Sequence, residues 1–372
     1  MKALAPYQIF FPIGVLSSLL AVGVWLVQHL NWFGTPALFI HSKLIVGGFI
    51  WSFIVGFLMT AVPKMTGTSP AKKIELAIAG LLMFLMIVFS WSLDPRYFYG
   101  THILLIVFLL IFGGRRLLKA TKPAPVFFPH VGYAVALALA GAAYHYSGQS
   151  YMGIHLYHVG TILLLVLGIG TRFFSFLSGL PSVFETSHQK STLRVFNLMG
   201  LATAGLLFLA GLDFTLAYLG LALVTLGYLF FFWKVQRPSA RPSALKWGVR
   251  IVALTIPLSF LLCWIQPGLY LTWLHILFIG CFTMICYAVG TRVTLAHGSY
   301  SLDIEMKSRA LWVFVSLLAL SMVARGLYGA VDGEMKIHLL HVAVYLWLLA
   351  IAGWIYSFFI RIFKPGKAAA SC

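Results

Sequence analysis

Residues 41–67, HSKLIVGGFIWSFIVGFLMTAVPKMTG, decide the fold class of this chain. Their central part, residues 44–63, has no charged side chain over 20 consecutive positions. A helix needs about 20 mainly apolar residues to cross the hydrocarbon core of a bilayer. Basic residues follow directly, at Lys64, Lys72 and Lys73. We therefore interpret the segment as a membrane-spanning helix that ends in a basic loop.

The same alternation of apolar stretch and short basic loop extends over the whole chain. Of the 372 residues, 61% are hydrophobic and only 9% are charged, whereas soluble domains carry about 25% charged residues. Such a chain cannot cover a water-facing surface, so the sequence predicts an all-α, polytopic membrane protein with a single transmembrane domain, residues 1–372. We expect about twelve transmembrane helices, at residues 9–30, 37–62, 74–93, 97–114, 127–147, 152–180, 192–211, 213–233, 245–265, 270–295, 309–329 and 336–362.

The basic residues indicate how these helices are oriented. The formal net charge is +18, and most Lys and Arg residues lie in the loops after spans two, four, eight and ten and in the C-terminal tail. Cytoplasmic loops of membrane proteins are enriched in Lys and Arg. We therefore expect both termini in the cytoplasm. Because the first helix lacks a small-residue cleavage site, we expect residues 9–30 to be a retained span. This charge distribution predicts the lipid bilayer as a partner and no nucleic acid.

Three of the predicted spans share a spacing of histidine and glycine. The spacing is 15 residues in each case, for the pairs His41 and Gly56, His155 and Gly170, and His275 and Gly290. The second and third glycines are both followed by Thr-Arg. Because the histidines lie on spans two, six and ten, the repeat predicts three arcs of four helices with pseudo-threefold symmetry, over residues 1–122, 123–241 and 242–372. The three histidines would lie at one height, near the outer face, around a common centre.

Histidines are the candidate functional residues. Nine of the twelve lie at or near the predicted outer ends of spans: His29, His41, His102, His145, His155, His158, His275, His338 and His341. Burying an imidazole in apolar surroundings costs free energy unless the ring is hydrogen-bonded or ligates a metal. His155 and His158, like His338 and His341, are three residues apart and would share a helix face. Each pair suits a metal ion, and a hydrogen-bonded pair at a helix end is the alternative.

Carboxylates and cysteines are less informative. No Asp or Glu lies well inside a predicted span, so a carboxylate proton relay is not expected. Three of the four cysteines lie inside apolar segments, where Cys behaves as a small hydrophobe. Lys43, two residues after His41, has two interpretations: it snorkels outward, or it is a cation beside a haem propionate or another bound anion.

Two stretches resemble the signatures of the NnrS family. The end of the opening segment, GFLMTAVPKMTG (56–67), is similar to the family's GFLxTAVPxxTG, and HILFIGCFTMICYAVGTRVTLAHG (275–298) is similar to its second signature. His41 matches the first histidine of the opening motif, and His275 and His297 match those of the second. The family's second histidine and its glutamate are replaced here by Lys43 and Leu44. We interpret His297, at the cytoplasmic end of span ten, as a structural or loop contact.

The resemblance implies a bacterial inner-membrane protein with haem b and copper, linked to nitric oxide metabolism and nitrosative stress. The three arcs also look like the haem–copper oxidase superfamily, but span seven lacks a histidine pair for copper and span ten lacks a second nearby histidine. We expect His41 and His275 as haem ligands near the periplasmic face, with Lys43 nearby. The other candidate metal ligands, for copper or to complete the haem site, are His155, His158, His102, His338 and His341.

Three function classes are consistent with these sequence features. The first is a haem protein that handles nitric oxide or another small gas, for which redox activity is possible and no catalytic residue is predicted. The second is a membrane cytochrome that passes electrons between quinol and a periplasmic partner. The third is a carrier of a small molecule or metal, with the histidines as a transient site and no haem. A Soret band in the purified protein distinguishes the first two from the third.

Overall fold

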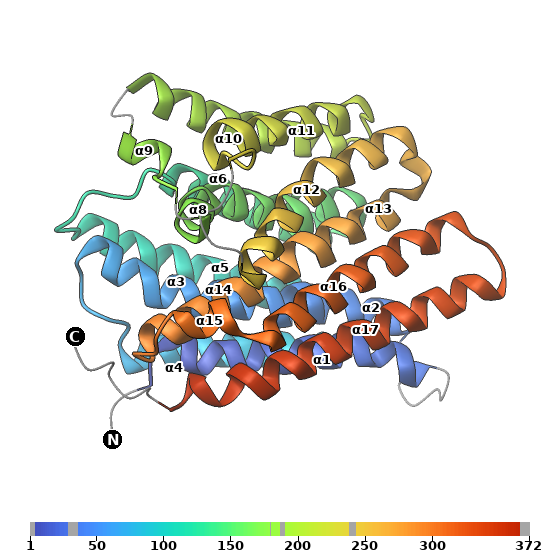
Figure 1. Ribbon diagram of the computed structural model, residues 1–372, viewed down its shortest axis with the longest axis horizontal. Helices are drawn as coiled ribbons and strands as arrows, with labels where there is room; N and C mark the ends of the chain where they lie inside the picture. The colour runs from blue at the N-terminus through green and yellow to red at the C-terminus, as the bar shows by residue number, and fades with distance from the viewer. Residues whose placement is uncertain (1–3, 29–35, 179, 187–189, 238–242, 365–372) are drawn as a thin grey trace.

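The computed structural model describes residues 4–28, 36–178, 180–186, 190–237 and 243–364. In these residues the chain is helical and contains no strand. The long helices lie side by side along one direction and form a bundle (Figure 1). The all-α prediction is therefore confirmed for the described part of the chain.

The first predicted arc contains a composite helix, in which α-helical and π-helical segments follow one another without a break. The described helices of this arc are α1 (Pro6–Val27), α2 (Ala37–Lys43), the π-helical η2 (Leu44–Ile50), α3 (Trp51–Thr66), α4 (Lys73–Phe89) and α5 (Pro95–Leu118). The segments α2, η2 and α3 join into one continuous helix, the second predicted span, of 30 residues.

The second and third predicted arcs have the same kind of composite helix at their sixth and tenth spans. The second arc contains α6 (Phe128–Tyr146), α7 (Ser150–Gly153), η3 (Ile154–Gly160), α8 (Thr161–Ser178), α9 (Val183–Thr186), α10 (Lys190–Gly211), α11 (Leu216–Gly227) and η4 (Tyr228–Trp233). The third contains α12 (Ala244–Ile265), η5 (Pro267–Leu269), α13 (Tyr270–Leu277), η6 (Phe278–Thr283), α14 (Met284–His297), α15 (Asp303–Lys307), α16 (Arg309–Leu327), η7 (Tyr328–Ala330), α17 (Glu334–Phe358) and η8 (Phe359–Ile362).

Ten helices in the described residues are long and apolar enough to cross a membrane. The chain is therefore a multi-pass membrane protein by helix length and composition. The third and fifth predicted spans correspond to α4 and α6, which are not among the ten. The 17 residues of α4 rise about 26 Å, somewhat less than the roughly 30 Å of a bilayer core. The count of about twelve spans thus stays a prediction.

The two ends of the described chain lie at the same end of the bundle. Gln8 Nε2 donates to the carbonyl oxygen of Ile362 at 2.8 Å, and Lys64 Nζ donates to His297 Nδ1 at 2.8 Å. The ring of Tyr7 also stacks on His297, with 5.6 Å between ring centroids. We call the end that holds Gln8, Lys64, His297 and Ile362 the inner end and the opposite one the outer end.

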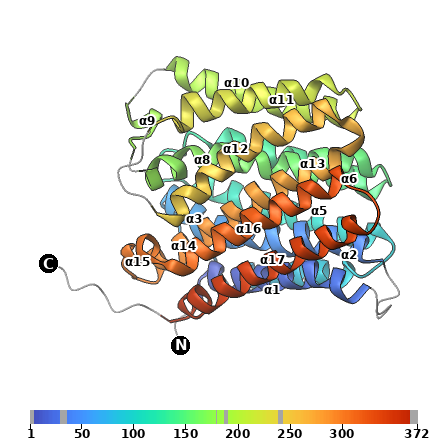
Figure 2. The same ribbon diagram turned by 45° about the vertical axis from the view of Figure 1, so that its right-hand side comes forward.

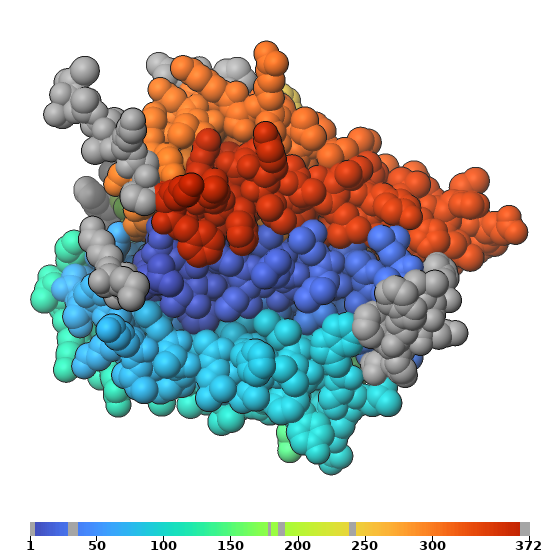
Figure 3. Space-filling view, turned by 90° about the horizontal axis from the view of Figure 1, so that it is seen from below, coloured from blue at the N-terminus to red at the C-terminus, as the bar shows by residue number. Residues whose placement is uncertain are grey.

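The first and last parts of the chain are neighbours. In two views, α10 and α11 lie at one edge of the bundle, while α1 and α17 lie at the opposite edge (Figures 1 and 2). Seen from below, α1 lies between α17 and the α4–α5 pair (Figure 3), and α1 packs along α17. The third predicted arc therefore contacts the first, as a closed ring of arcs requires. The threefold symmetry itself stays a prediction.

A π-helical segment lies close to the repeated histidine in each of the three long spans. η2 begins three residues after His41, η6 begins three residues after His275, and η3 includes His155. In a π-helix the backbone bonds run to the fifth residue, so each turn holds more residues than in an α-helix. Such segments are rare and are frequently found at functional sites.

The repeated Gly-Thr has a physical basis in two of the spans. Trp233 Nε1 donates to Thr171 Oγ1 at 3.2 Å, and Trp354 Nε1 donates to Thr291 Oγ1 at 2.8 Å. Each threonine hydroxyl in turn donates to the carbonyl four residues earlier, at 2.8 Å in both cases. Both tryptophans are fully buried. The repeat therefore marks equivalent tryptophan–threonine contacts that join span six to span eight and span ten to span twelve.

Aromatic rings pack directly against the repeated glycines. A Cβ atom at Gly170 would lie 2.6 Å from the Trp233 ring, and one at Gly290 would lie 2.7 Å from the Phe53 ring. At Gly56 the nearest atoms, in the Phe11 ring, would lie at 3.0 Å. Real side chains cannot approach so closely, so glycine at these positions sets how tightly the long spans pack.

We expect Gly290→Ala to destabilise the bundle by about 1–3 kcal/mol, because the added methyl group overpacks the contact with Phe53. The control is Gly353→Ala on α17, where a Cβ would meet nothing within 4 Å. The midpoint of thermal unfolding in detergent measures both variants. Equal midpoints for the two variants would contradict the packing role of Gly290.

Candidate functional site

His41 and His275 have the same anchoring. His41 Nδ1 lies 2.8 Å from the carbonyl oxygen of Ala21 on α1, and His275 Nδ1 lies 2.6 Å from that of Leu271. Because a carbonyl oxygen only accepts, Nδ1 carries the proton and donates in both rings. The lone pair of each neutral imidazole is therefore on Nε2. This is the tautomer that metal-ligating histidines adopt when their second nitrogen is held by a carbonyl.

Arg325, near the outer end of α16, completes this group. It lies close enough to His41 and His275 for its charge to act on both rings. The Arg325 guanidinium lies over the Tyr328 ring, 4.5 Å from the centroid. Its Nη1 is buried and has no hydrogen-bond partner in the described part of the chain. A buried cationic donor without a partner is costly, which makes Arg325 suited to an anionic group beside the two histidines.

Lys43 does not join this group through a hydrogen bond. The residue is buried, and its Nζ donates to the carbonyl oxygen of Ser92 at 2.7 Å, in the connection between α4 and α5. The carboxylate of Asp94 lies in the same connection and attracts it. A hydrogen bond from Arg96, with a smaller contribution from Lys43, holds the pKa of Asp94 below its usual value. The ammonium is thus directed to the outer loop, in the manner of the snorkelling interpretation.

His155 belongs to a separate network. Its Nδ1 donates to the carbonyl oxygen of Tyr151 at 2.9 Å, and its Nε2 accepts from the Tyr218 hydroxyl at 2.6 Å. The ring also stacks on Tyr270, with 5.8 Å between centroids. Tyr151 in turn donates to Asp213 at 3.1 Å. Both nitrogens of His155 are therefore engaged within the protein, so it does not join His41 and His275 around a common centre.

His158 and His102 lie in a third group. His158 Nδ1 lies 3.1 Å from His145 Nε2, and His102 Nδ1 bonds the hydroxyl of Tyr157. All four residues are buried. His102 Nε2 has no hydrogen-bond partner among the described residues, and its ring lies nearly perpendicular to the Trp51 ring, with 4.3 Å between centroids.

We expected His155 and His158 to share a helix face, and the structure corrects this expectation. His155 bonds Tyr218 on α11, whereas His158 bonds His145 on α6. The pair lies in the π-helix η3, where residues three apart do not follow the α-helical spacing on which the expectation was based. The local backbone thus gives the two imidazoles different partners.

The remaining candidates lie on α17. His338 is exposed and His341 is half-buried. In the residues that the structure describes, no group of three or more His, Cys, Asp or Glu side chains is placed to hold a metal ion. The donor set therefore does not fit a copper site built from three such ligands, and copper stays a prediction from the resemblance. His29 lies outside the described residues.

Sequence reasoning missed Arg325 and Tyr218, and it placed His145 among the outer histidines without selecting it as a metal ligand. Arg325 was visible as a basic residue at the predicted outer side, where Lys and Arg are otherwise scarce, and this exception was its signal. Tyr218 and His145 carry no comparable signal, because a tyrosine or histidine in an apolar span is common near an interface. Their roles come from contacts between helices far apart in sequence.

The family comparison gives a match, while the search of curated proteins does not. No curated protein matches this chain. The family model described as NnrS protein matches residues 3–365, nearly the whole sequence. His297, within the second family motif, bonds Lys64 at the inner end, far along the helix from His275. The chain belongs to the NnrS protein family.

Proposed function

We propose that this chain is a haem-binding protein of the bacterial inner membrane that serves nitric oxide metabolism or the response to nitrosative stress. Its family membership suggests a nitric-oxide-related membrane protein. The observation that supports the haem site is the arrangement of His41, His275 and Arg325. Two imidazoles present Nε2 lone pairs, and the half-buried Arg325 beside them has a buried Nη1 without a partner in the described residues.

The residues present fit a b-type haem. Histidine Nε2 is an ordinary axial ligand of haem iron, and a carbonyl acceptor on Nδ1–H fixes the ring and raises the basicity of Nε2. Both residues are half-buried, and a backbone carbonyl holds the Nδ1 atom of each ring. Arg325 would pair with a propionate through a charge-assisted hydrogen bond. When bound, a haem would supply iron for electron transfer or for binding a small gas.

The number of histidines that bind the iron, His41 and His275 or one of them, would determine which of these two activities the site favours. If both His41 and His275 held the iron, the site would favour electron transfer. If only one of them held it, the site would favour binding of a gas. Nitric oxide is small and apolar enough to arrive through the bilayer, so this role requires no polar channel.

We expect His41→Ala and His275→Ala to lose most of their bound haem, because each removes an Nε2 ligand whose ring is already oriented. Arg325→Met should retain haem less tightly, since it removes the cation but leaves both imidazoles. His297→Ala is the matched control, because its ring bonds Lys64 at the inner end. Absorbance spectra of purified variants, normalised to protein, measure the haem. Unchanged haem content in both alanine variants would refute the assignment.

We also propose that the inner end faces the cytoplasm and the histidine groups lie near the periplasm. Lysines and arginines gather at the inner end, among them Lys64, Lys72 and Arg116. Cytoplasmic loops of membrane proteins carry an excess of lysine and arginine, so the inner end matches the cytoplasmic side.

Alkaline phosphatase, which is active only in the periplasm, should be inactive when fused after residue 364. The same enzyme inserted at Asp213, in the outer connection between α10 and α11, should be active. A fluorescent protein at these two positions should give the opposite pattern. Active phosphatase at the C-terminal fusion would contradict the orientation.

A further inference from the structure

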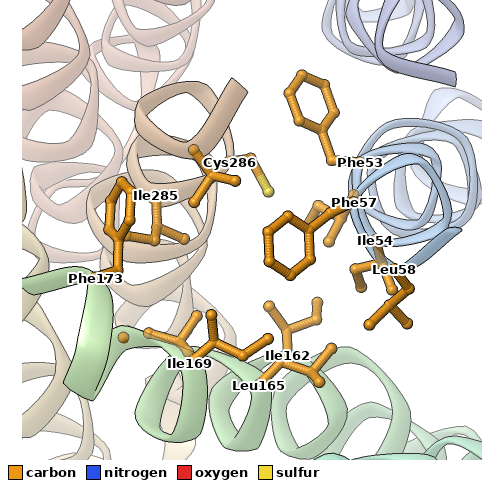
Figure 4. Close-up of a pocket in the computed structure, with 14 residues that line it drawn as sticks. Phe53, Ile54, Phe57, Leu58, Ile162, Leu165, Ile169, Phe173, Ile285 and Cys286 are labelled. Carbon is orange, nitrogen blue, oxygen red and sulfur yellow. The ribbon is translucent and has the colours of Figure 1, made fainter. Parts of the chain in front are cut away.

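An apolar cavity lies where the three long spans meet. Its wall comes from η2 and α3 of span two, α8 of span six and α14 of span ten, and it measures about 90 Å³. Phe53 and Phe57 lie on one side, Ile169 on another and Ile285 on the third (Figure 4). Among the described residues, no polar atom contributes to the exposed wall.

Size and polarity restrict what this cavity can hold. A buried water needs two to four polar partners, and an apolar cavity of about 150 Å³ stays dry and takes benzene or xenon. The described wall of this cavity offers water no partner. The cavity is also smaller than the engineered cavity of about 150 Å³, so a small apolar molecule suits it.

We propose that the cavity binds a diatomic gas and holds it inside the membrane domain, on the same three helices that carry His41, His155 and His275. None of these three histidines lines the cavity, and Phe53 follows His41 by 12 residues, so the cavity is distinct from the histidine group. The choice of nitric oxide as the physiological gas rests on the proposed function. Occupation of the cavity by a small apolar molecule does not depend on the proposed function.

Cys286 provides a built-in reporter. Its side chain belongs to the wall, and the sulfur atom points into the space between Phe53 and Phe57 (Figure 4). The residue is buried, with 9% of its surface exposed. An S–H group is a weak donor whose stretching frequency responds to its surroundings. A gas molecule in the cavity should therefore shift the infrared S–H band of Cys286.

The test uses purified full-length protein under xenon pressure, with xenon binding followed by nuclear magnetic resonance. We expect saturable binding to the wild type. Val166→Phe, which places a ring in the cavity wall, should weaken binding by about tenfold or more. Val313→Phe is the matched control, because Val313 is 52% exposed on α16, away from the cavity, and it should bind as the wild type does.

Infrared spectra of the wild type give a second readout that requires no filling variant. The S–H band lost in Cys286→Ala should shift when xenon or nitric oxide is added. Unchanged xenon affinity in Val166→Phe, no xenon binding to the wild type, or a lipid chain occupying the cavity would each overturn the proposal. The His275→Ala variant separates the two proposals, since it should still bind xenon whether or not it holds haem.

Discussion

An imidazole inside an apolar helix bundle has two nitrogen atoms, and each one left buried without a partner costs about 1–3 kcal/mol. In this protein the constraint is met by different means at different histidines. His155 has both nitrogens engaged by Tyr151 and Tyr218. His41 and His275 have Nδ1 engaged by backbone carbonyls. The carbonyl bond leaves their Nε2 atoms as lone-pair donors, and the proposed haem site depends on this difference.

Backbone geometry distributes the histidines among these groups. π-Helical segments accompany all three repeated histidines, and the extra residues per turn change which neighbour each side chain meets. Further along the same helices, Gly170 and Gly290 allow rings to approach the backbone, and Thr171 and Thr291 accept tryptophan N–H groups. The outer halves of the long spans carry the three histidines, while their middle portions line an apolar cavity.

The sequence predicts much of the fold and less of the site. Apolar length identified the helices, and the Gly-Thr-Arg repeat located equivalent contacts, because both depend on residues close together in sequence. The α-helical spacing of His155 and His158 was misleading, since the backbone there is π-helical. Arg325 and Tyr218 were not selected, because their roles depend on contacts with histidines 50 or more residues away in other helices. Such contacts are fixed by packing and leave no local pattern.

The optical spectrum of the wild-type protein, purified from haem-replete cells and recorded before and after reduction, tests the central claim most directly. Nε2 lone pairs on His41 and His275 beside the unpartnered Nη1 of Arg325 predict a Soret band and a haem b pyridine haemochrome. A colourless protein without iron would contradict the account, and would favour a carrier whose histidines bind their cargo only transiently.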